Sequence, residues 1–492
     1  MISQLPIINL VALLLMAIMV PFIKKISFRA TLWLGGILLI GVLVSSVFIF
    51  IHVANVGDII YHFGDYESFL GIEFKVDPFA SLFTLFVGTL AFIIYVYSSG
   101  DKTEGIESPE FSRYYVLYFL MLFAMFGILY SNDLFNTYVF IEIISLTSCA
   151  IISIKRKKEP YPAAFRYVLL NEIGSLSFLF GIAMLYMISG HLNIDLLANT
   201  IQSGWTTLPI NIIFAIVFMT VGLSLKAAIF PFHIWLPDAH ASAPSTSSAI
   251  LSAVVVKIYI LVLIKLILKV FGVELFASLG MDTVLLIFGG AGMIMGSIFA
   301  MTQKDLKRML GYSSVSQIGY IVVGLALMSD LGLRSAFFHI ISHGLTKAAL
   351  FLSVGIVIYL KKSRSVKGFE GLGFQIPIAM TVFGIAAFSM IGIPLTSGFI
   401  AKWNLGIAVE SASQYIFLGV IVISSLLNAM YYLPILFAAF LKDNPEHQEK
   451  VSIEKIPAAM LLPIVVLGLS ILLIGIYPNL LMQLIDLVIA RL

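Results

Sequence analysis

Apolar runs of about 20 residues follow one another along almost the whole chain, and they restrict its possible folds more than any other feature. Such a run is long enough to cross the hydrocarbon core of a bilayer as a helix, where no water satisfies an unpaired backbone group. The composition agrees, because 60% of the 492 residues are hydrophobic and 11% are charged. The sequence therefore predicts an all-α polytopic membrane protein, and its net charge of +3 indicates no nucleic-acid partner.

We interpret these runs as about 14 transmembrane helices joined by loops, with no soluble domain. The first run is followed by lysines and lacks a small-residue cleavage site, so we interpret it as a span rather than a signal peptide. The expected spans are residues 5–22, 29–51, 78–98, 113–130, 134–154, 163–189, 208–230, 245–270, 281–301, 309–328, 334–360, 375–410 (broken), 415–440 and 456–482.

The Lys and Arg residues of the loops support this assignment, because they are concentrated in alternate loops. The rich set holds Lys24, Lys25, Arg29, Lys102, Arg113, Lys155, Arg156, Lys157, Lys158, Lys304, Lys307, Arg308, Lys361, Lys362, Arg364, Lys367, Lys442, Lys450 and Lys455. The poor set, with the C-terminus, holds Lys75, Lys269, Arg334 and Arg491. Since basic loops stay in the cytoplasm, we expect both termini outside it, in a cell inner membrane or plasma membrane.

Two spans are interrupted by proline, which removes a backbone donor and clashes with the preceding turn. The seventh breaks around Pro231-Phe232 and the twelfth around Gly392-Ile393-Pro394. A pair of ordinary kinks is one interpretation. The breaks lie five helices apart in spans of opposite direction, however, and each span carries a lysine, Lys226 or Lys402. Interrupted segments at matching positions favour two inverted five-helix repeats, helices 4–8 and 9–13, with discontinuous helices 7 and 12.

This interpretation predicts a single transmembrane domain over residues 1–492. Its expected parts are helices 1–3 (1–112), the first repeat (113–270), the second repeat (281–440) and the last helix (441–492).

Charged side chains within the spans give the strongest indication of function. Inserting a lysine near mid-bilayer costs about 2.5–3.5 kcal/mol of free energy on insertion scales. Such a lysine is therefore expected to have a charged partner, contact with water or a function. Lys226 and Lys257 lie in the seventh and eighth spans, and Glu142 of the fifth is a natural partner for Lys226. Charges 4 Å apart attract by about 4 kcal/mol at an effective dielectric of 20. Movement of Glu142 would therefore switch Lys226 between holding and releasing a proton.

Three titratable residues of the eleventh span, His339, His343 and Lys347, follow one another at intervals of four, which places them on one helical stripe. Single hydrogen-bonded core residues would explain one histidine but not this stripe. A haem or metal site is an alternative, but no carboxylate or cysteine accompanies the pair, and lysine is a poor ligand. A proton relay that includes Lys257 and Lys402 fits better. We expect Lys265, close to a span end, to extend its amine to the membrane surface.

Four linked motifs resemble one family, the antiporter-like membrane subunits. KAAIFPFHIWLPDAHASAP followed by ILSAVVVK is similar to the family's seventh-to-eighth helix signature, and KDLKRMLGYSSVSQIGYI to its ninth-to-tenth helix junction. HIISHGLTKAALFLSVG resembles the eleventh helix, and IPLTSGFIAKW the broken twelfth. The family includes subunits of respiratory complex I, Mrp-type multisubunit sodium/proton antiporters and membrane-bound hydrogenases. The resemblance extends from about residue 114 to 432 and implies fourteen helices with two inverted repeats.

The resemblance also implies roles for particular residues. Glu142 with Lys226 would be the gating pair, Lys257 the central relay and Lys402 the terminal protonatable group, linked by the stripe of His339, His343 and Lys347. Lysine at both 257 and 402 is similar to the D-type chain of Mrp antiporters and to its hydrogenase counterparts, whereas some complex I subunits have His or Glu at those places. One departure is Thr246-Ser247, where the family usually has proline and an aliphatic residue.

Three function classes remain. The chain is expected to be a proton-translocating subunit of an Mrp-type cation/proton antiporter, coupled to sodium exchange and bound to other subunits. Alternatively, it is the equivalent subunit of a hydrogenase-type or complex I-like redox complex. A transporter whose lysines bind a small anion is the third class. The chain has no motif for flavin, iron–sulfur or haem, and its single cysteine, Cys149, excludes a cysteine metal site, so we predict no cofactor and no redox or hydrolytic active site.

Overall fold

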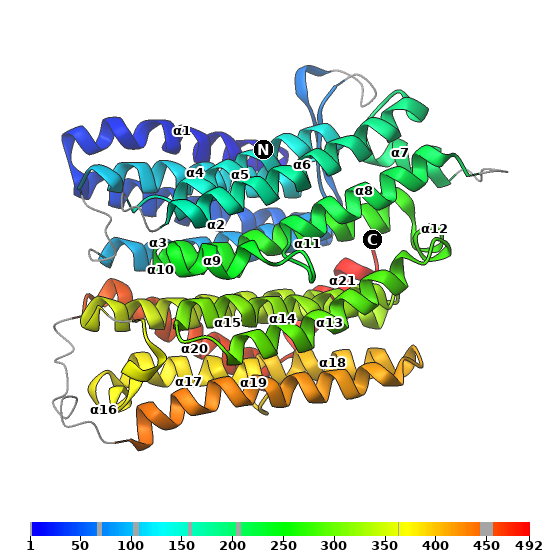
Figure 1. The fold of residues 1–492 in the computed structure, drawn as a ribbon. Coiled ribbons are helices and arrows are strands. Elements are labelled where there is room, and N and C mark those ends of the chain that lie inside the picture. The colour runs from blue at the N-terminus through cyan, green and yellow to red at the C-terminus, as the bar shows by residue number, and fades with distance from the viewer. Residues whose placement is uncertain are drawn as a thin grey trace.

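The computed structural model describes residues 2–65, 71–101, 108–155, 160–202, 208–362, 364–442 and 456–492. Across these residues the fold is a bundle of long helices lying along one common direction, with the helices up to α11 above and those from α13 to α20 below in Figure 1. Of the basic loop residues, Lys102, Arg156, Lys157, Lys158, Lys450 and Lys455 lie outside the described residues.

Twelve helices of the described chain are long and apolar enough to cross a membrane, which confirms the all-α polytopic class. They are α1 (Leu5–Ile26), α2 (Phe28–Asn55), α3 (Pro78–Gly100), α4 (Ser108–Tyr130), α5 (Leu134–Ile152), α6 (Tyr161–Ser189), the eighth-span helix (Ser245–Phe271), α13 (Met281–Met301), α14 (Leu306–Ala326), α15 (Asp330–Lys361), α19 (Tyr415–Leu441) and α20 (Ala458–Ile476).

The two predicted interruptions are present. The seventh span is divided into α8 (Ile210–Lys226) and α9 (Trp235–Ser242), and the twelfth into α17 (Pro377–Ile391) and α18 (Ser397–Ser411). If each pair counts as one crossing, the total is the expected fourteen. That count, the inverted symmetry of the repeats and the domain boundaries stay predictions.

Several short elements were not predicted. Strands β1 (Ile59–His62) and β2 (Glu73–Val76) pair as an antiparallel hairpin. The last span ends at Ile476, because Tyr477-Pro478 separates α20 from α21 (Asn479–Ile489). The remaining short elements are α7 (Ile194–Gln202), α12 (Val273–Ser278), α16 (Leu372–Gln375), and the 3₁₀ turns η1 (Ile2–Gln4), η2 (Phe63–Asp65) and η5 (Val366–Phe369).

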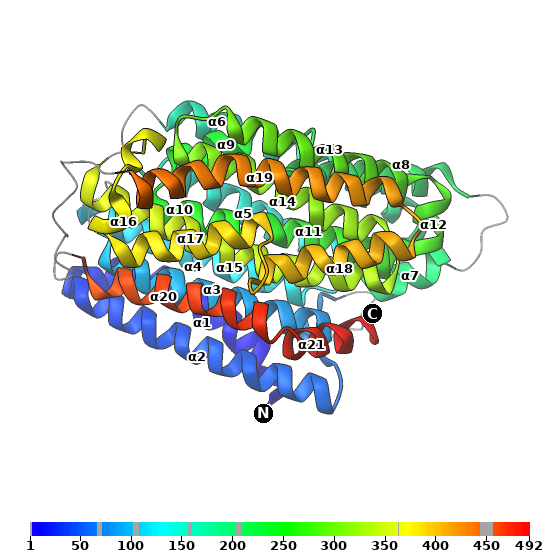
Figure 2. The ribbon, with the colours of Figure 1, turned by 90° about the horizontal axis from the view of Figure 1, so that it is seen from below.

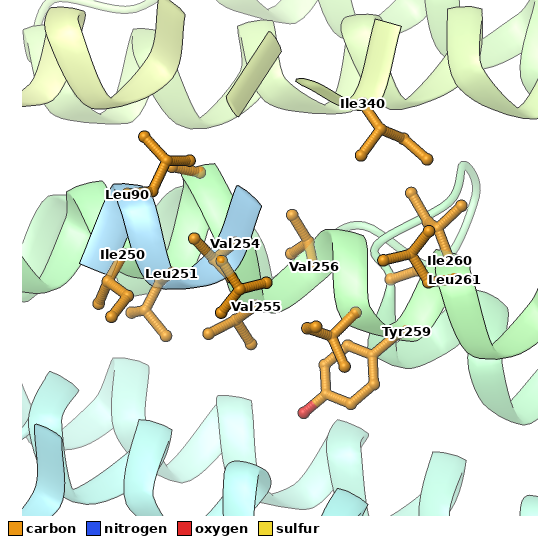
Figure 3. Close-up of a cluster of buried hydrophobic side chains, with 14 of the residues drawn as sticks. Leu90, Ile250, Leu251, Val254, Val255, Val256, Tyr259, Ile260, Leu261 and Ile340 are labelled. Carbon is orange, nitrogen blue, oxygen red and sulfur yellow. The ribbon is translucent and has the colours of Figure 1, made fainter. Parts of the chain in front are cut away.

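The eighth-span helix lies at the centre of the bundle and contains two unexpected π-helical segments. It runs through α10 (Ser245–Ile250), η3 (Leu251–Val255), α11 (Val256–Lys265) and η4 (Leu266–Phe271). Its hydrophobic side chains are buried on all sides, and Figure 3 shows Leu90 of α3 and Ile340 of α15 packed around it. In contrast, α1 and α2 lie along one edge of the molecule in Figure 2. A helix that is apolar all round belongs in the core, so a lysine on it is held inside protein.

Asp77 joins the start of α3 to the eighth-span helix. Its carboxylate caps α3 by accepting a hydrogen bond from the Ala80 backbone N–H at 2.7 Å, and it forms a buried ion pair with Lys269. Burial alone would raise the pKa of this carboxyl, but Lys269 and Lys265 hold it below its ordinary value. A carboxylate with a lowered folded-state pKa stabilises the fold above its unfolded pKa, and this stabilisation is lost as the pH falls through the folded-state value.

Asp77→Asn is therefore expected to destabilise the protein, because it preserves a capping side chain but leaves Lys269 without its counter-charge. The expected loss is about 3–5 kcal/mol of unfolding free energy near neutral pH, seen as a lower Tm in detergent. The difference from wild type should shrink in acid. Asp305→Asn is the matched control, since Asp305 caps α14 in the same way, at 2.9 Å from the Arg308 N–H, and should change the Tm little. Equal Tm values for all three proteins would contradict the role of the ion pair.

Candidate functional site

The structure brings Glu142 and Lys226 together, as predicted. Lys226 is the last residue of α8, and its Nζ lies 3.6 Å from Oε1 of Glu142 on α5. The same amine donates a 2.7 Å hydrogen bond to Ser145, while Ser175 of α6 donates to the Glu142 carboxylate. The lysine side chain is fully buried and that of Glu142 is 20% exposed. The pair is thus an ion pair with a hydroxyl on each partner.

Two glycines position this lysine by letting α6 and α8 cross closely. A Cβ on Gly222 would lie 2.5 Å from the carbonyl oxygen of Gly174, and one on Gly174 would lie 2.8 Å from that of Gly222. Neither distance leaves room for a side chain. The Cβ on Gly174 would also come within 3.2 Å of Cγ of Lys226, so the close crossing places the lysine against α6.

Lys257 lies directly after the π-helical segment η3, and its amine donates to the backbone carbonyl of Ser252 within that segment. π-Helical turns of this kind are frequent at functional sites. Among the described residues no ion pair joins Lys257 to a carboxylate. The side chain of Ser252 hydrogen-bonds that of Ser314 on α14 at 2.9 Å. The lysine that was predicted as the central relay therefore bonds to Ser252, the residue whose hydroxyl contacts α14.

Polar groups of α14 lie between Lys257 of α11 and Lys347 of α15. The amine of Lys347 donates to the Leu310 carbonyl at 2.8 Å and to the hydroxyl of Ser313. Ser314 donates to the same Leu310 carbonyl at 3.0 Å. Lys347 thus shares a carbonyl with Ser314. Ser314 in turn bonds the hydroxyl of Ser252, whose backbone carbonyl accepts from Lys257.

Tyr320 of α14 lies between His339 and Lys402. The imidazole of His339 stacks on the Tyr320 ring at 5.4 Å between centroids, and Nε2 is 3.0 Å from Oε1 of Gln317. Nζ of Lys402 lies 4.6 Å from the centre of the same tyrosine ring. The histidine and the lysine, from α15 and α18, therefore share one aromatic neighbour.

Lys402 belongs to α18, and its side chain reaches back to the break between α17 and α18. Its amine donates to the carbonyls of Met390 and Ile391, at 2.9 and 3.0 Å, and to Ser425 of α19 at 3.0 Å. The end of a helix leaves its last carbonyls without partners, so the break supplies acceptors for the buried ammonium. Lys226 and Lys402 thus use their breaks differently, the first with a carboxylate and the second with backbone carbonyls.

Several links of the predicted series have no direct hydrogen bond among the described residues, including both links of His343 and the one between Lys226 and Lys257. The His343 ring is 6.1 Å from that of His339, and neither of its nitrogens has a partner there. Nζ of Lys226 lies 5.7 Å from the ring centre of Tyr259, which is two residues beyond Lys257. Figure 3 shows that ring directed away from Ile340 of α15. Transfer across these links would need water.

The prediction for Lys265 was wrong. Its side chain is 8% exposed, and its amine donates to the backbone carbonyl of Ser131 rather than reaching the membrane surface. The loop between α4 and α5 covers this end of the eighth-span helix, which hydropathy alone does not reveal. In the described residues no group of three or more His, Cys, Asp or Glu could hold a metal ion.

Sequence reasoning missed the polar residues that connect the charged ones. The missed set comprises Ser145, Ser175, Ser252, Ser313, Ser314, Gln317, Tyr320 and Ser425. A signal was present in the run SSVSQ, residues 313–317, because so many polar side chains in one span need partners inside the bundle.

Comparison with known proteins gives consistent matches. A family model described as NADH:quinone oxidoreductase/Mrp antiporter, transmembrane, matches residues 131–428. The N subunit of the NADH-quinone oxidoreductase of Desulforudis audaxviator is 36% identical over 83% of this chain and 82% of that protein. The D subunit of the Na⁺/H⁺ antiporter of Alkalihalophilus pseudofirmus is 29% identical over 94% and 93%. A chain of the Mrp complex from Dietzia sp. DQ12-45-1b shares the fold with a TM-score of 0.88, at 24% identity over 100% of this chain and 97% of that chain.

Proposed function

Because the chain belongs to the NADH:quinone oxidoreductase/Mrp antiporter transmembrane family, we propose that it translocates protons as one subunit of a multisubunit membrane complex. Its homologues are subunits of such complexes, of the Mrp type and of the complex I-like type. Within this chain, protons would pass between Lys226, Lys257, Lys347, His343, His339 and Lys402. Glu142 would control the proton on Lys226.

The observation that carries the proposal is that polar side chains and backbone carbonyls lie between the buried lysines and histidines. Between Lys257 and Lys347 lie two serine hydroxyls and two backbone carbonyls. Between His339 and Lys402 lie the ring of Tyr320 and a glutamine side chain. Water beside these groups would complete the transfer. A bare ion cannot cross dry hydrocarbon, so lateral proton movement requires titratable groups or water at hydrogen-bond spacing. A transmembrane voltage of 100 mV supplies about 2.3 kcal/mol per charge, so no site in the series can hold its proton much more tightly than that.

For the host complex, we propose an Mrp-type antiporter in which proton movement is coupled to sodium exchange. The likeness to the D chain of the Na⁺/H⁺ antiporter extends over nearly the whole chain. A redox-driven complex is the second candidate, because the relative from NADH-quinone oxidoreductase is more identical, at 36%. Purifying the chain with its native partners separates the two: copurified redox subunits would favour the second. We further propose that the loops rich in Lys and Arg face the cytoplasm.

Lys402→Ala tests the proposal. Removal of the amine takes away the terminal protonatable group, so proton transport by the assembled complex should fall by a factor of about 100 or more. The measurement is quenching of a pH-sensitive dye in vesicles that contain equal amounts of complex. Lys442→Ala is the control, because that lysine is 63% exposed and pairs with Glu370 at 3.0 Å, so transport should be unchanged. Full transport in Lys402→Ala would contradict proton translocation through this series.

A further inference from the structure

A fully buried histidine, His240, lies outside the series described above. His240 on α9 is completely buried, and neither of its ring nitrogens has a hydrogen-bond partner among the described residues. A buried polar group without a partner is costly, and such groups are commonly satisfied by ordered water. Two unpaired nitrogens on one buried ring therefore indicate a position that holds water rather than a dry packing site.

His240 lies close to the face of the molecule that carries the basic loops. The next two residues, Ala241 and Ser242, are partly exposed. Arg364 donates to the Ala241 carbonyl at 2.5 Å, and Lys307 donates to that of Ala243 at the same distance. The ring is thus fully buried although its own helix reaches the basic surface within one residue.

On its inner side, His240 is one aromatic ring away from Lys347. The centroids of His240 and Phe351 are 4.9 Å apart, and Nζ of Lys347 lies 5.9 Å from the centre of the same phenylalanine ring. Phe351 follows Lys347 by one turn of α15. The histidine therefore stands between the basic surface and the second half of the lysine series, with Phe351 as an apolar partition.

Two hydroxyls provide an independent sign of water at this place. Thr246 and Ser247 of α10 are completely buried, and neither hydroxyl has a partner among the described residues. Their neighbour Ser248 donates to the backbone carbonyl of His240 at 3.0 Å, which holds α10 against α9 at the histidine. Four unpaired polar atoms, two ring nitrogens and two hydroxyl oxygens, thus belong to two joined helical segments.

We propose that His240, with Thr246 and Ser247, forms a water-holding uptake site that passes protons from the basic face to Lys347. A neutral imidazole binds a proton from water on one nitrogen and releases the proton of the other nitrogen, so the ring passes on one proton and is left as the other neutral tautomer. A flip of the ring, or return of the ring proton through water, resets it for the next proton. Water at the edge of Phe351 completes the step to Lys347, and movement of that ring controls the step. This inference rests on the proposed proton translocation.

The first test measures access of water and does not depend on transport. In a Cys149→Ser background, Ser247→Cys is compared with Ala249→Cys, two equally buried positions of the same segment α10. Thiols react as thiolates and need water, so a small anionic methanethiosulfonate added at the basic face of the assembled complex should label Ser247→Cys at least about 10-fold faster. Equal labelling rates would overturn the uptake site.

The second test separates proton transfer from a structural role. His240→Ala should lower proton transport at least about 10-fold with normal assembly, and added imidazole should restore it, since free imidazole replaces the missing group. Ser242→Ala, a partly exposed residue on the same helix, should transport normally. A defect that imidazole does not restore, or no defect, would overturn the inference. If Lys402→Ala loses transport but His240→Ala transports normally, only the uptake site is rejected. If Lys347→Ala and Lys402→Ala both transport normally, the proposed function itself is rejected.

Discussion

Glu142→Gln is expected to abolish proton transport, by a factor of about 100 or more, while the complex still assembles. The amide keeps the size of the side chain and can still accept the hydrogen bond from Ser175. It cannot supply the negative charge that lies 3.6 Å from Lys226. Without that charge, Lys226 loses the partner whose movement would change the proton affinity of its amine.

Lys226→Ala should be at least as severe, because it leaves the partly buried Glu142 carboxylate without its cation. Dye quenching in vesicles measures transport in both variants, and native gel electrophoresis measures assembly. Glu370→Gln is the matched control, since Glu370 also pairs with a lysine but is 41% exposed. Near-normal transport in either pair variant, with the control also normal, would refute the gating role.

Lys257→Ala is the second change with a large expected effect. This amine bonds the carbonyl of Ser252, whose hydroxyl contacts Ser314 of α14, and its removal would interrupt the proposed series between the two halves of the bundle. Transport should fall to the level of a complex without this subunit, about 100-fold or more. The fold should survive, because the alanine leaves a small buried space and removes an ammonium that has no carboxylate partner among the described residues.

Lys307→Ala would be a poor control for this change, since Lys307 is buried and holds the Ala243 carbonyl. Lys361→Ala is suitable, because that residue lies at the end of α15 and away from the series. If Lys257→Ala transports as Lys361→Ala does, protons do not pass through position 257.

Much of the fold could be predicted because membrane helices follow from length and hydropathy alone. The ends of α3 and α13 agree with the spans expected from the sequence to within two residues, and both proline interruptions occur where expected. The β-hairpin was missed because its strands are four residues long and contribute little pattern. The π-helical segments were missed because apolar residues continue through them, so periodicity does not distinguish them from α-helix.

In the site, the charged residues within spans could be identified from the sequence, because placing a charge in a membrane costs free energy and such residues are rare there. Glu142 and Lys226 could be paired because opposite charges two helices apart have few other partners. The serines of α14 could not be assigned, since a hydroxyl in a helix can bond to its own backbone and needs no partner elsewhere. Lys265 was misassigned because distance along a span does not show that the α4–α5 loop covers it. The roles of all seven charged and histidine residues stay predictions until transport is measured.

Proton transport by the Lys257→Arg complex, measured beside wild type and Lys257→Ala, tests the central claim most directly. Arginine keeps the positive charge and can still donate to the Ser252 carbonyl, but guanidinium hardly releases a proton. If protons hop through this side chain, Lys257→Arg should transport no better than Lys257→Ala although the complex assembles and the charge is preserved. Transport near the wild-type rate in Lys257→Arg would show that position 257 needs only a charge, and it would contradict a relay through this lysine.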